Sequence, residues 1–275
     1  MCRPGRCGYR LRYDSSSSSG DRYARFPVGP LNPFRSLSQS LLRPALDAFR
    51  GLDRLLDGGM AALAKIFFGL GLGWWLYVPV HELLHAGACL ATGGGVERLE
   101  IDGMYGGALL AKIFPFVVSG SEYAGRLSGF DTGGSDFVYL ATDFGPFLLT
   151  LFPGVWLLRH AVFKRRAFLF GLALPLALAP FISLTGDAYE IGSILTTSSG
   201  PWSDAASSAL LRGDDVFKKF AELRAAGSSA PWGGFGLAIA LGFAWAEGTF
   251  ALGALIARKL GRRAIEARSS NPNKI

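Results

Sequence analysis

Four long apolar runs constrain this chain more than any other feature of its sequence. They cover about Ala61–Leu90, 137–158, 167–185 and 233–257. As helices, runs of about 20 residues cross a hydrocarbon layer about 30 Å thick. Prolines inside the runs are tolerated because neighbouring helices can satisfy the backbone groups that a break sets free. We therefore expect an all-α membrane bundle of about four transmembrane helices, with a small β element after the first span.

The basic residues are concentrated on one side of the expected bundle. Of 28 Lys and Arg residues, 20 fall in residues 1–60, 159–166 and 258–275, and only 7 fall in 93–136 and 188–231. With four spans the three basic segments share one membrane face, and an excess of Lys and Arg marks the cytoplasmic face. Both chain ends are therefore expected in the cytoplasm. Orientation and anionic lipid explain the net charge of +7, so no nucleic-acid partner is expected.

Shorter segments flank the apolar core expected at residues 59–260. Residues 1–35 are rich in Arg, Ser, Gly and Pro and are expected to form a disordered basic tail. Residues 261–275 are expected to form a basic C-terminal tail. Residues 36–58 repeat apolar side chains at helical spacing with arginines among them, which predicts an amphipathic helix. Such a helix either lies in the membrane interface or packs on the core as a short soluble helix.

Residues 96–118, between the first two runs, differ in their residue pattern from the rest of the core. Short apolar alternation between Gly-rich turns predicts two or three short strands. For residues 108–118 the alternative is a re-entrant loop. An exposed strand edge in this stretch could accept an extended peptide by strand addition.

The chemistry-bearing motif is His81-Glu82-Leu83-Leu84-His85, an H-E-x-x-H pattern within the first run. On a helix, positions i and i+4 share one face, so both imidazoles can reach one zinc ion. Glu82 lies beside them and can act as a general base toward a water molecule that zinc acidifies. Two histidines and a glutamate are costly in an apolar helix unless they are functional. A metal site is therefore favoured over a helix end that meets interfacial water.

A catalytic zinc site needs a third protein ligand and an open fourth position. Asp187 is the first candidate because the third run is expected to end there, on the face where the first run ends. Asp143, early in the second run, and Glu190, three residues after Asp187, are the alternatives. Cys89 shares a helical face with His85 and could add a thiolate. In a run of small residues, however, close helix packing explains Cys89 better.

Two further ionisable residues receive no role in this site. His160 lies among basic residues on the opposite face and is expected to be a solvated loop residue. Glu247, midway along the fourth run, is expected to face the bundle interior or a polar cavity, and it remains unassigned.

Two segments resemble the site-2 protease family of intramembrane zinc metalloproteases. They are HELLHAGAC at 81–89 and the later aspartate in APFISLTGDAYEIGS at 179–193. The strand-like stretch at 96–118 also lies where that family carries membrane-associated strands. The resemblance covers about 61–193.

This resemblance implies a zinc cofactor bound by His81, His85 and Asp187, with Glu82 as the catalytic general base. The chain is thus expected to be an intramembrane zinc metalloendopeptidase that hydrolyses peptide bonds in or near transmembrane segments of membrane-protein substrates. Its expected partners are those substrates and the lipid bilayer, and no oligomeric state follows from the sequence.

Two other classes of protein share the same motif. One is a non-proteolytic metal-binding membrane protein, such as a pseudoprotease scaffold or a metal carrier. The other is a structural membrane protein in which the motif is fortuitous. Glu82 separates these classes, because hydrolysis needs a general base whereas metal storage, transport and scaffolding do not.

Overall fold

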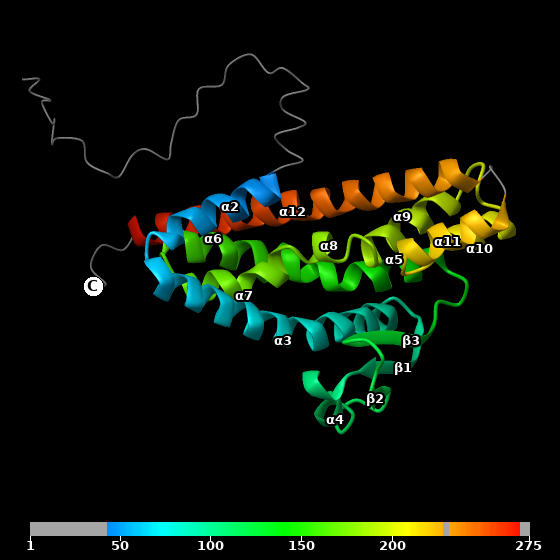
Figure 1. The fold of residues 1–275 in the computed structure, drawn as a ribbon, viewed down its shortest axis with the longest axis horizontal. Helices are drawn as coiled ribbons and strands as arrows, with labels where there is room; N and C mark the ends of the chain where they lie inside the picture. The colour runs from blue at the N-terminus through cyan, green and yellow to red at the C-terminus, as the bar shows by residue number, and fades with distance from the viewer. Residues whose placement is uncertain (1–42, 228–230, 270–275) are drawn as a thin grey trace, which may run out of the picture. The chain divides into compact units, whose positions relative to one another are not determined.

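The computed structural model describes residues 43–227 and 231–269, which form a helical bundle with one small sheet (Figure 1). Within this part, three helices are long and apolar enough to cross a membrane: Gly59–Ala91, Asp136–Phe163 and Pro231–Gly261. The expected tail at 1–35 and the last residues, 270–275, lie outside the described residues.

Two of these long helices are continuous and the middle one is segmented. The first is α3 (Gly59–Ala91), and the last belongs to α12 (Pro231–Ser269). The middle helix contains Pro146 and Pro153, which cannot donate backbone hydrogen bonds. Its segments are α5 (Asp136–Phe144), the 3-10 turn η2 (Gly145–Phe147), the π-helical turn η3 (Thr150–Gly154) and α6 (Val155–Phe163).

The third apolar run is not one helix, contrary to the expectation for 167–185. It forms α7 (Ala167–Ala177) and α8 (Ala179–Ile182), and a turn then leads to α9 (Asp187–Thr197). Pro180 stands in the first turn of α8, the position where a missing backbone N–H costs least. The break after α8 corrects the expected place of Asp187, which begins a helix instead of ending one.

A three-stranded sheet lies between α3 and α5 in the chain. β1 (Gly95–Ile101) is central, β2 (Val117–Ser119) pairs parallel with it, and β3 (Gly125–Asp131) pairs antiparallel with it. The 3-10 turn η1 (Gly103–Tyr105) and the short helix α4 (Gly107–Leu110) connect β1 to β2. The prediction of strands in 96–118 is confirmed for β1 and β2, but it missed β3.

The sheet packs on the helix that contains the H-E-x-x-H motif. Leu99 and Ile101 of β1 and Val117 of β2 form a buried apolar cluster with Ala86 of α3. The two buried residues of β1 lie on either side of the half-buried Glu100, as expected for side chains that alternate between the two faces of a strand. The packing therefore fixes the sheet directly beside His85 and its neighbours.

Helix α2 (Arg43–Leu56) confirms the predicted amphipathic helix over its described part, and residues 36–42 lie outside that part. Leu55 and Gly51 are buried, and Leu55 joins a core cluster with residues of α3, α6 and α7. Phe49, on another face of α2, is 67% exposed. The helix therefore packs on the core by one face and leaves an apolar side chain outside.

A helical hairpin covers the beginning of α12. It consists of α10 (Ala205–Leu211) and α11 (Val216–Ala226). Leu211 and Leu223 pack with Tyr189 and Phe235, and the Tyr189 hydroxyl donates a 2.8 Å hydrogen bond to the Leu211 carbonyl. Figure 1 shows the hairpin and the sheet toward one end of the bundle, with α2 and the α6–α7 turn toward the other.

Helices α3 and α7 approach closely enough for backbone to touch backbone. Gly69 and Gly73 lie one helical turn apart on α3. A Cβ added at Gly73 would lie 2.6 Å from the Leu172 carbonyl oxygen, and one at Gly69 would overlap the Phe168 carbonyl oxygen. Small residues at this spacing allow membrane helices to pack tightly.

The same kind of contact joins α9 to α12. A Cβ at Gly192 would overlap the Ala238 carbonyl oxygen, and a Cβ at Gly242 would overlap the Ala188 carbonyl oxygen. Ala188 directly follows Asp187, so this contact fixes the beginning of α9. The broken α7–α9 segment is thereby held against α3 at one end and α12 at the other.

Replacing Gly69 with alanine should destabilise the bundle, because the new methyl group meets rigid backbone of α7. We expect Gly69→Ala to lower the free energy of unfolding by about 1–3 kcal/mol, the usual cost of overpacking. Thermal unfolding of the detergent-solubilised protein measures this change. Gly71→Ala is the matched control, because a Cβ there meets nothing within 4 Å. Equal melting temperatures for the two variants would contradict the proposed close contact.

Candidate metal centre

Three potential metal ligands converge from two helices. His81 and His85 lie one turn apart on α3, and Asp187 lies in the first turn of α9. The Nε2 atoms of the two histidines are 3.2 Å apart. Asp187 Oδ2 is 3.3 Å from His81 Nε2, and Asp187 Oδ1 is 3.6 Å from His85 Nε2. The structure thus brings together the three residues that the sequence nominated.

The orientation of His85 is set by a backbone group of α5. His85 Nδ1 lies 2.8 Å from the carbonyl oxygen of Thr142. A carbonyl oxygen only accepts hydrogen bonds, so Nδ1 must donate its proton. The Nε2 atom of neutral His85 then presents a lone pair toward His81 and Asp187. Such a hydrogen bond on the remote ring nitrogen is the usual support for a metal-binding histidine.

A tyrosine supports His81 in the corresponding way. The Tyr77 hydroxyl lies 2.7 Å from His81 Nδ1, and both side chains are buried. When the Tyr77 oxygen accepts a hydrogen bond from His81 Nδ1–H, His81 Nε2 also presents a lone pair. Tyr77 precedes His81 by four residues, so the helical spacing that pairs His81 with His85 pairs Tyr77 with His81.

Asp187 is held in place by the turn that precedes α9. Its backbone N–H donates a 3.1 Å hydrogen bond to the Ser183 hydroxyl. The Thr185 carbonyl accepts a 3.1 Å hydrogen bond from the Val216 backbone N–H, which ties the turn to the α10–α11 hairpin. The N-terminus of a helix favours negative charge, so α9 stabilises the Asp187 carboxylate.

The donor atoms of this cluster fit a cation. Asp187 Oδ2 is buried and has no hydrogen-bond partner among the described residues, although it faces His81 Nε2. Lone pairs that point at one another repel unless a positive charge lies among them, and an unpaired buried acceptor is costly. Together, His81, His85 and Asp187 could hold a metal ion.

The other predicted ligands lie outside this cluster. Asp143 is buried with its Oδ2 unpartnered among the described residues, and Glu190 accepts a hydrogen bond from the Tyr139 hydroxyl. Cys89 is buried, and its thiol faces the Gly95 carbonyl oxygen at 3.5 Å. This position agrees with a packing role for Cys89.

Glu82 lies beside the cluster and against the sheet. A Cβ added at Gly125 of β3 would lie 2.5 Å from Glu82 Cγ, so β3 runs directly over this side chain. Within residues 43–227 and 231–269, no hydrogen bond or ion pair engages the Glu82 carboxylate. The carboxylate is therefore available to a substrate or a water molecule.

An ion pair joins the end of α10 to the first turn of α5. Arg212, at the end of α10, reaches both oxygens of Asp136 at 2.6 and 3.0 Å, and it also donates a 2.7 Å hydrogen bond to the Thr197 hydroxyl. Asp136 begins α5, the helix that supplies the Thr142 carbonyl. The paired guanidinium and carboxylate therefore connect the hairpin to the helix that orients His85.

His160 and Glu247 lie away from the cluster. His160 was expected in a solvated loop, but it lies in the last turn of α6 and stacks on Trp156 with ring centroids 5.3 Å apart. Arg159–Phe163 continues α6 because apolar residues extend past His160. Glu247 is half-buried on α12, without an ion-pair partner among the described residues.

Several supporting groups were not anticipated from the sequence. The role of Tyr77 could have been predicted from helical spacing alone, because it precedes His81 by four residues. The Thr142 carbonyl has no residue-type signal, because any residue would supply the same oxygen. The position of Gly125 depends on the pairing of β3 with β1, which joins residues far apart in the chain.

Comparisons with protein-family models, with curated proteins and with solved structures gave no match. The functional assignment therefore depends on the residues of the cluster and their geometry.

Replacing Asp187 should remove the metal site, because two histidines on one helix turn offer too few ligands for tight binding. Elemental analysis of the purified protein should find about one zinc per chain in the wild type and a clear loss in Asp187→Ala. Asp143→Asn is the matched control, since Asp143 is a buried acid outside the cluster. Full zinc content in Asp187→Ala, or loss in Asp143→Asn alone, would contradict this ligand set.

Proposed function

We propose that this chain is an intramembrane zinc metalloprotease, similar to the site-2 protease family, that hydrolyses peptide bonds in or near transmembrane segments. The observation that supports this most is the convergence of His81, His85 and Asp187 beside the unengaged carboxylate of Glu82. An ionisable cluster within apolar helices is costly and is usually retained for function.

Zinc is the metal that the donor set favours. Two imidazoles and one carboxylate form a common ligand set for catalytic zinc. Ligands about 2.05 Å from a tetrahedral zinc lie about 3.3 Å from one another, by simple geometry. The two Nε2 atoms here are 3.2 Å apart, and each lies 3.3 or 3.6 Å from a different oxygen of Asp187. With one donor atom from each residue, all three donors lie within 4.8 Å of one another. When bound, zinc would supply Lewis acidity and lower the pKa of a coordinated water molecule.

Glu82 would be the general base of the reaction. It takes a proton from the attacking water and passes that proton to the nitrogen of the leaving amine. Its position directly after His81 keeps it beside the ligand cluster, and β3 limits its movement on one side. Tyr77 and the Thr142 carbonyl hold the two imidazoles in place during this step.

The broken segment α7–α9 would cross the membrane as the third of four passes in chain order. Its first part packs along α3 and its last part along α12, as the glycine contacts indicate. The break between α8 and α9 then brings Asp187 to the depth of His81 within the bundle. Both chain ends would lie in the cytoplasm, on the side of the basic segments.

The substrate would be an extended segment of a membrane protein. In the described part of the chain, β3 pairs with β1 on one side only, so its other edge can accept a strand. β3 lies against Glu82 through Gly125, which makes it a better placed edge than any strand in 96–118. A helical substrate would have to unwind first, because its backbone groups are bonded internally.

Glu82→Gln should bind zinc normally and lose hydrolysis, because the amide cannot accept the proton. We expect a rate at least about 10²-fold lower, the usual contribution of a general base. The assay follows new peptide termini by mass spectrometry, with fluorescein-labelled β-casein and a panel of single-span peptides as substrates. Zinc binding without hydrolysis in the wild type would favour a non-proteolytic metal-binding protein. Equal hydrolysis by both proteins would contradict the role of Glu82.

Gly125→Ala should slow hydrolysis without loss of zinc, because the added methyl group would displace the Glu82 side chain. We expect an effect on the rate of at least about tenfold, since small misplacements of a catalytic group are costly. Gly103→Ala is the control, because a Cβ there meets nothing within 4 Å. Unchanged hydrolysis by Gly125→Ala would show that β3 does not position Glu82.

A further inference from the structure

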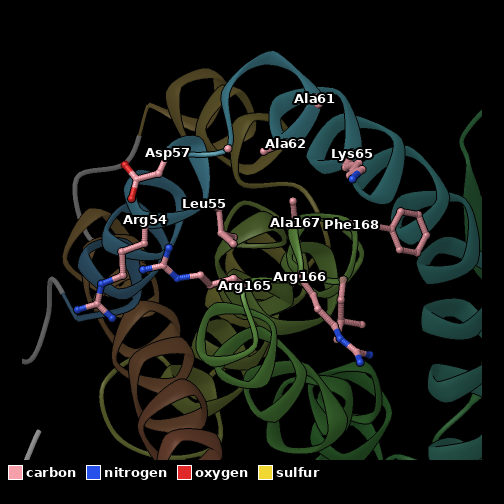
Figure 2. Close-up of a pocket in the computed structure, with 12 residues that line it drawn as sticks. Arg54, Leu55, Asp57, Ala61, Ala62, Lys65, Arg165, Arg166, Ala167 and Phe168 are labelled. Atoms are coloured by element: carbon pink, nitrogen blue, oxygen red, sulfur yellow. The ribbon is translucent and has the colours of Figure 1, made fainter. Parts of the chain in front are cut away.

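A cavity of 760 Å³ lies where α2 meets the beginning of α3 and the turn between α6 and α7 (Figure 2). Lys65, from α3, lies on its wall, 16 residues before His81. That separation corresponds to about 24 Å of helix rise, so the cavity and the metal centre lie at different depths of the bundle. The cavity therefore belongs to a separate site.

The walls of this cavity are strongly basic. Four cationic side chains line it, Arg54, Lys65, Arg165 and Arg166, against one acid, Asp57. No carboxylate of the described residues lies within ion-pair distance of Lys65, Arg165 or Arg166. By contrast, Arg159 of the neighbouring α6 pairs with Asp47 at 3.7 Å. Lys65, Arg165 and Arg166 thus concentrate positive charge at the cavity that no carboxylate of the described residues pairs with, and this charge attracts anions.

The backbone of Arg165 has a conformation that normally favours glycine. Arg165 has φ of 50°, the only positive φ outside glycine in the described part of the chain. It follows Lys164, the C-cap of α6, and the Arg165 and Arg166 N–H groups bond back to the Val162 and Ala161 carbonyls. Glycine is the usual residue at this position of such a helix end. An arginine there adds strain, and local strain of this kind is found where a side chain is needed for function.

The two arginines of this turn extend to different sides of the cavity. Figure 2 shows Arg165 directed toward the side formed by α2 and Arg166 directed toward the opposite side. A guanidinium donates two parallel hydrogen bonds to a phosphate group, and an ammonium adds a compact charge. Arg165, Arg166 and Lys65 thus place positive charge on more than one side of the cavity, which favours a phosphate group within it.

The floor and surroundings of the cavity are apolar. Leu55, Ala62 and Ala167 are buried beneath it. Phe168 lines it and packs on Phe68 of α3 with ring centroids 5.9 Å apart, and Phe68 is itself 72% exposed. A ligand with a phosphate head and acyl chains would therefore meet charge within the cavity and apolar surface beside it.

We infer that this cavity binds the phosphate headgroup of an anionic phospholipid. Basic pockets between membrane helices on the cytoplasmic side are suited to such headgroups. The inference rests on the membrane location and orientation proposed above, and it does not depend on zinc or hydrolysis. Bound lipid would join α2 to α3 and to the α6–α7 turn.

The test measures lipid binding to the detergent-purified full chain by native mass spectrometry. Phosphatidylglycerol is titrated against phosphatidylcholine with the same acyl chains. The wild type should prefer phosphatidylglycerol, and Arg165→Gly and Arg166→Gln should each bind it about tenfold more weakly, the effect of losing one charged hydrogen bond. Lys164→Gln is the matched control, because Lys164 is in the same turn but faces the Phe163 ring and does not line the cavity. It should bind as the wild type does.

Arg165→Gly also separates binding from folding. Glycine removes the backbone strain, so the melting temperature should stay equal or rise while lipid binding falls. No preference for phosphatidylglycerol, or equal weakening by Lys164→Gln, would overturn the inference. Displacement of the lipid by millimolar inorganic phosphate alone would identify a free phosphate site instead of a lipid site. Since zinc content and hydrolysis are not measured here, failure of this test leaves the proposed protease activity unaffected.

Discussion

The arrangement of this protein centres on the mutual approach of two imidazoles and one carboxylate inside an apolar bundle. The two Nε2 atoms lie 3.2 Å apart, and each lies 3.3 or 3.6 Å from one oxygen of Asp187. Atoms whose lone pairs face one another repel, so other contacts must hold them in place. Here the Tyr77 hydroxyl holds His81, the Thr142 carbonyl holds His85, and the turn before α9 holds Asp187. These groups belong to α3, to α5 and to the turn before α9, so the cluster depends on how these three segments pack together.

Close backbone contact makes this convergence possible. The glycines of α3 and α9 remove the side chains that would otherwise separate α3 from α7 and α9 from α12. In a hydrocarbon environment, helices gain little from hiding apolar surface, and tight packing of this kind provides much of their association. The helical hydrogen bonds are interrupted at the turn before α9. There the Ser183 hydroxyl accepts from the Asp187 N–H, and the Val216 N–H of the α10–α11 hairpin donates to the Thr185 carbonyl.

Local sequence patterns predicted the helices well where apolar residues dominate or recur at helical spacing. The apolar runs predicted the three long helices, and apolar spacing with arginines predicted α2. The patterns failed where backbone geometry decides. The run at 167–185 is uniformly apolar, so composition alone could not show that it divides into α7 and α8 before the turn to Asp187. β3 was missed because its partner is β1, about 30 residues earlier in the chain, and its own residues are mostly polar or small.

The sequence by itself determined that His81, Glu82 and His85 share one helix turn, because a helix repeats every 3.6 residues whatever surrounds it. It also limited the third ligand to a few acids. Only the tertiary structure shows which of these acids meets the histidines: Asp187 does, whereas Asp143 and Glu190 do not belong to the cluster. That choice depends on where α9 begins and how it packs on α12, which are interactions between segments far apart in the chain. No local spacing rule contains this information.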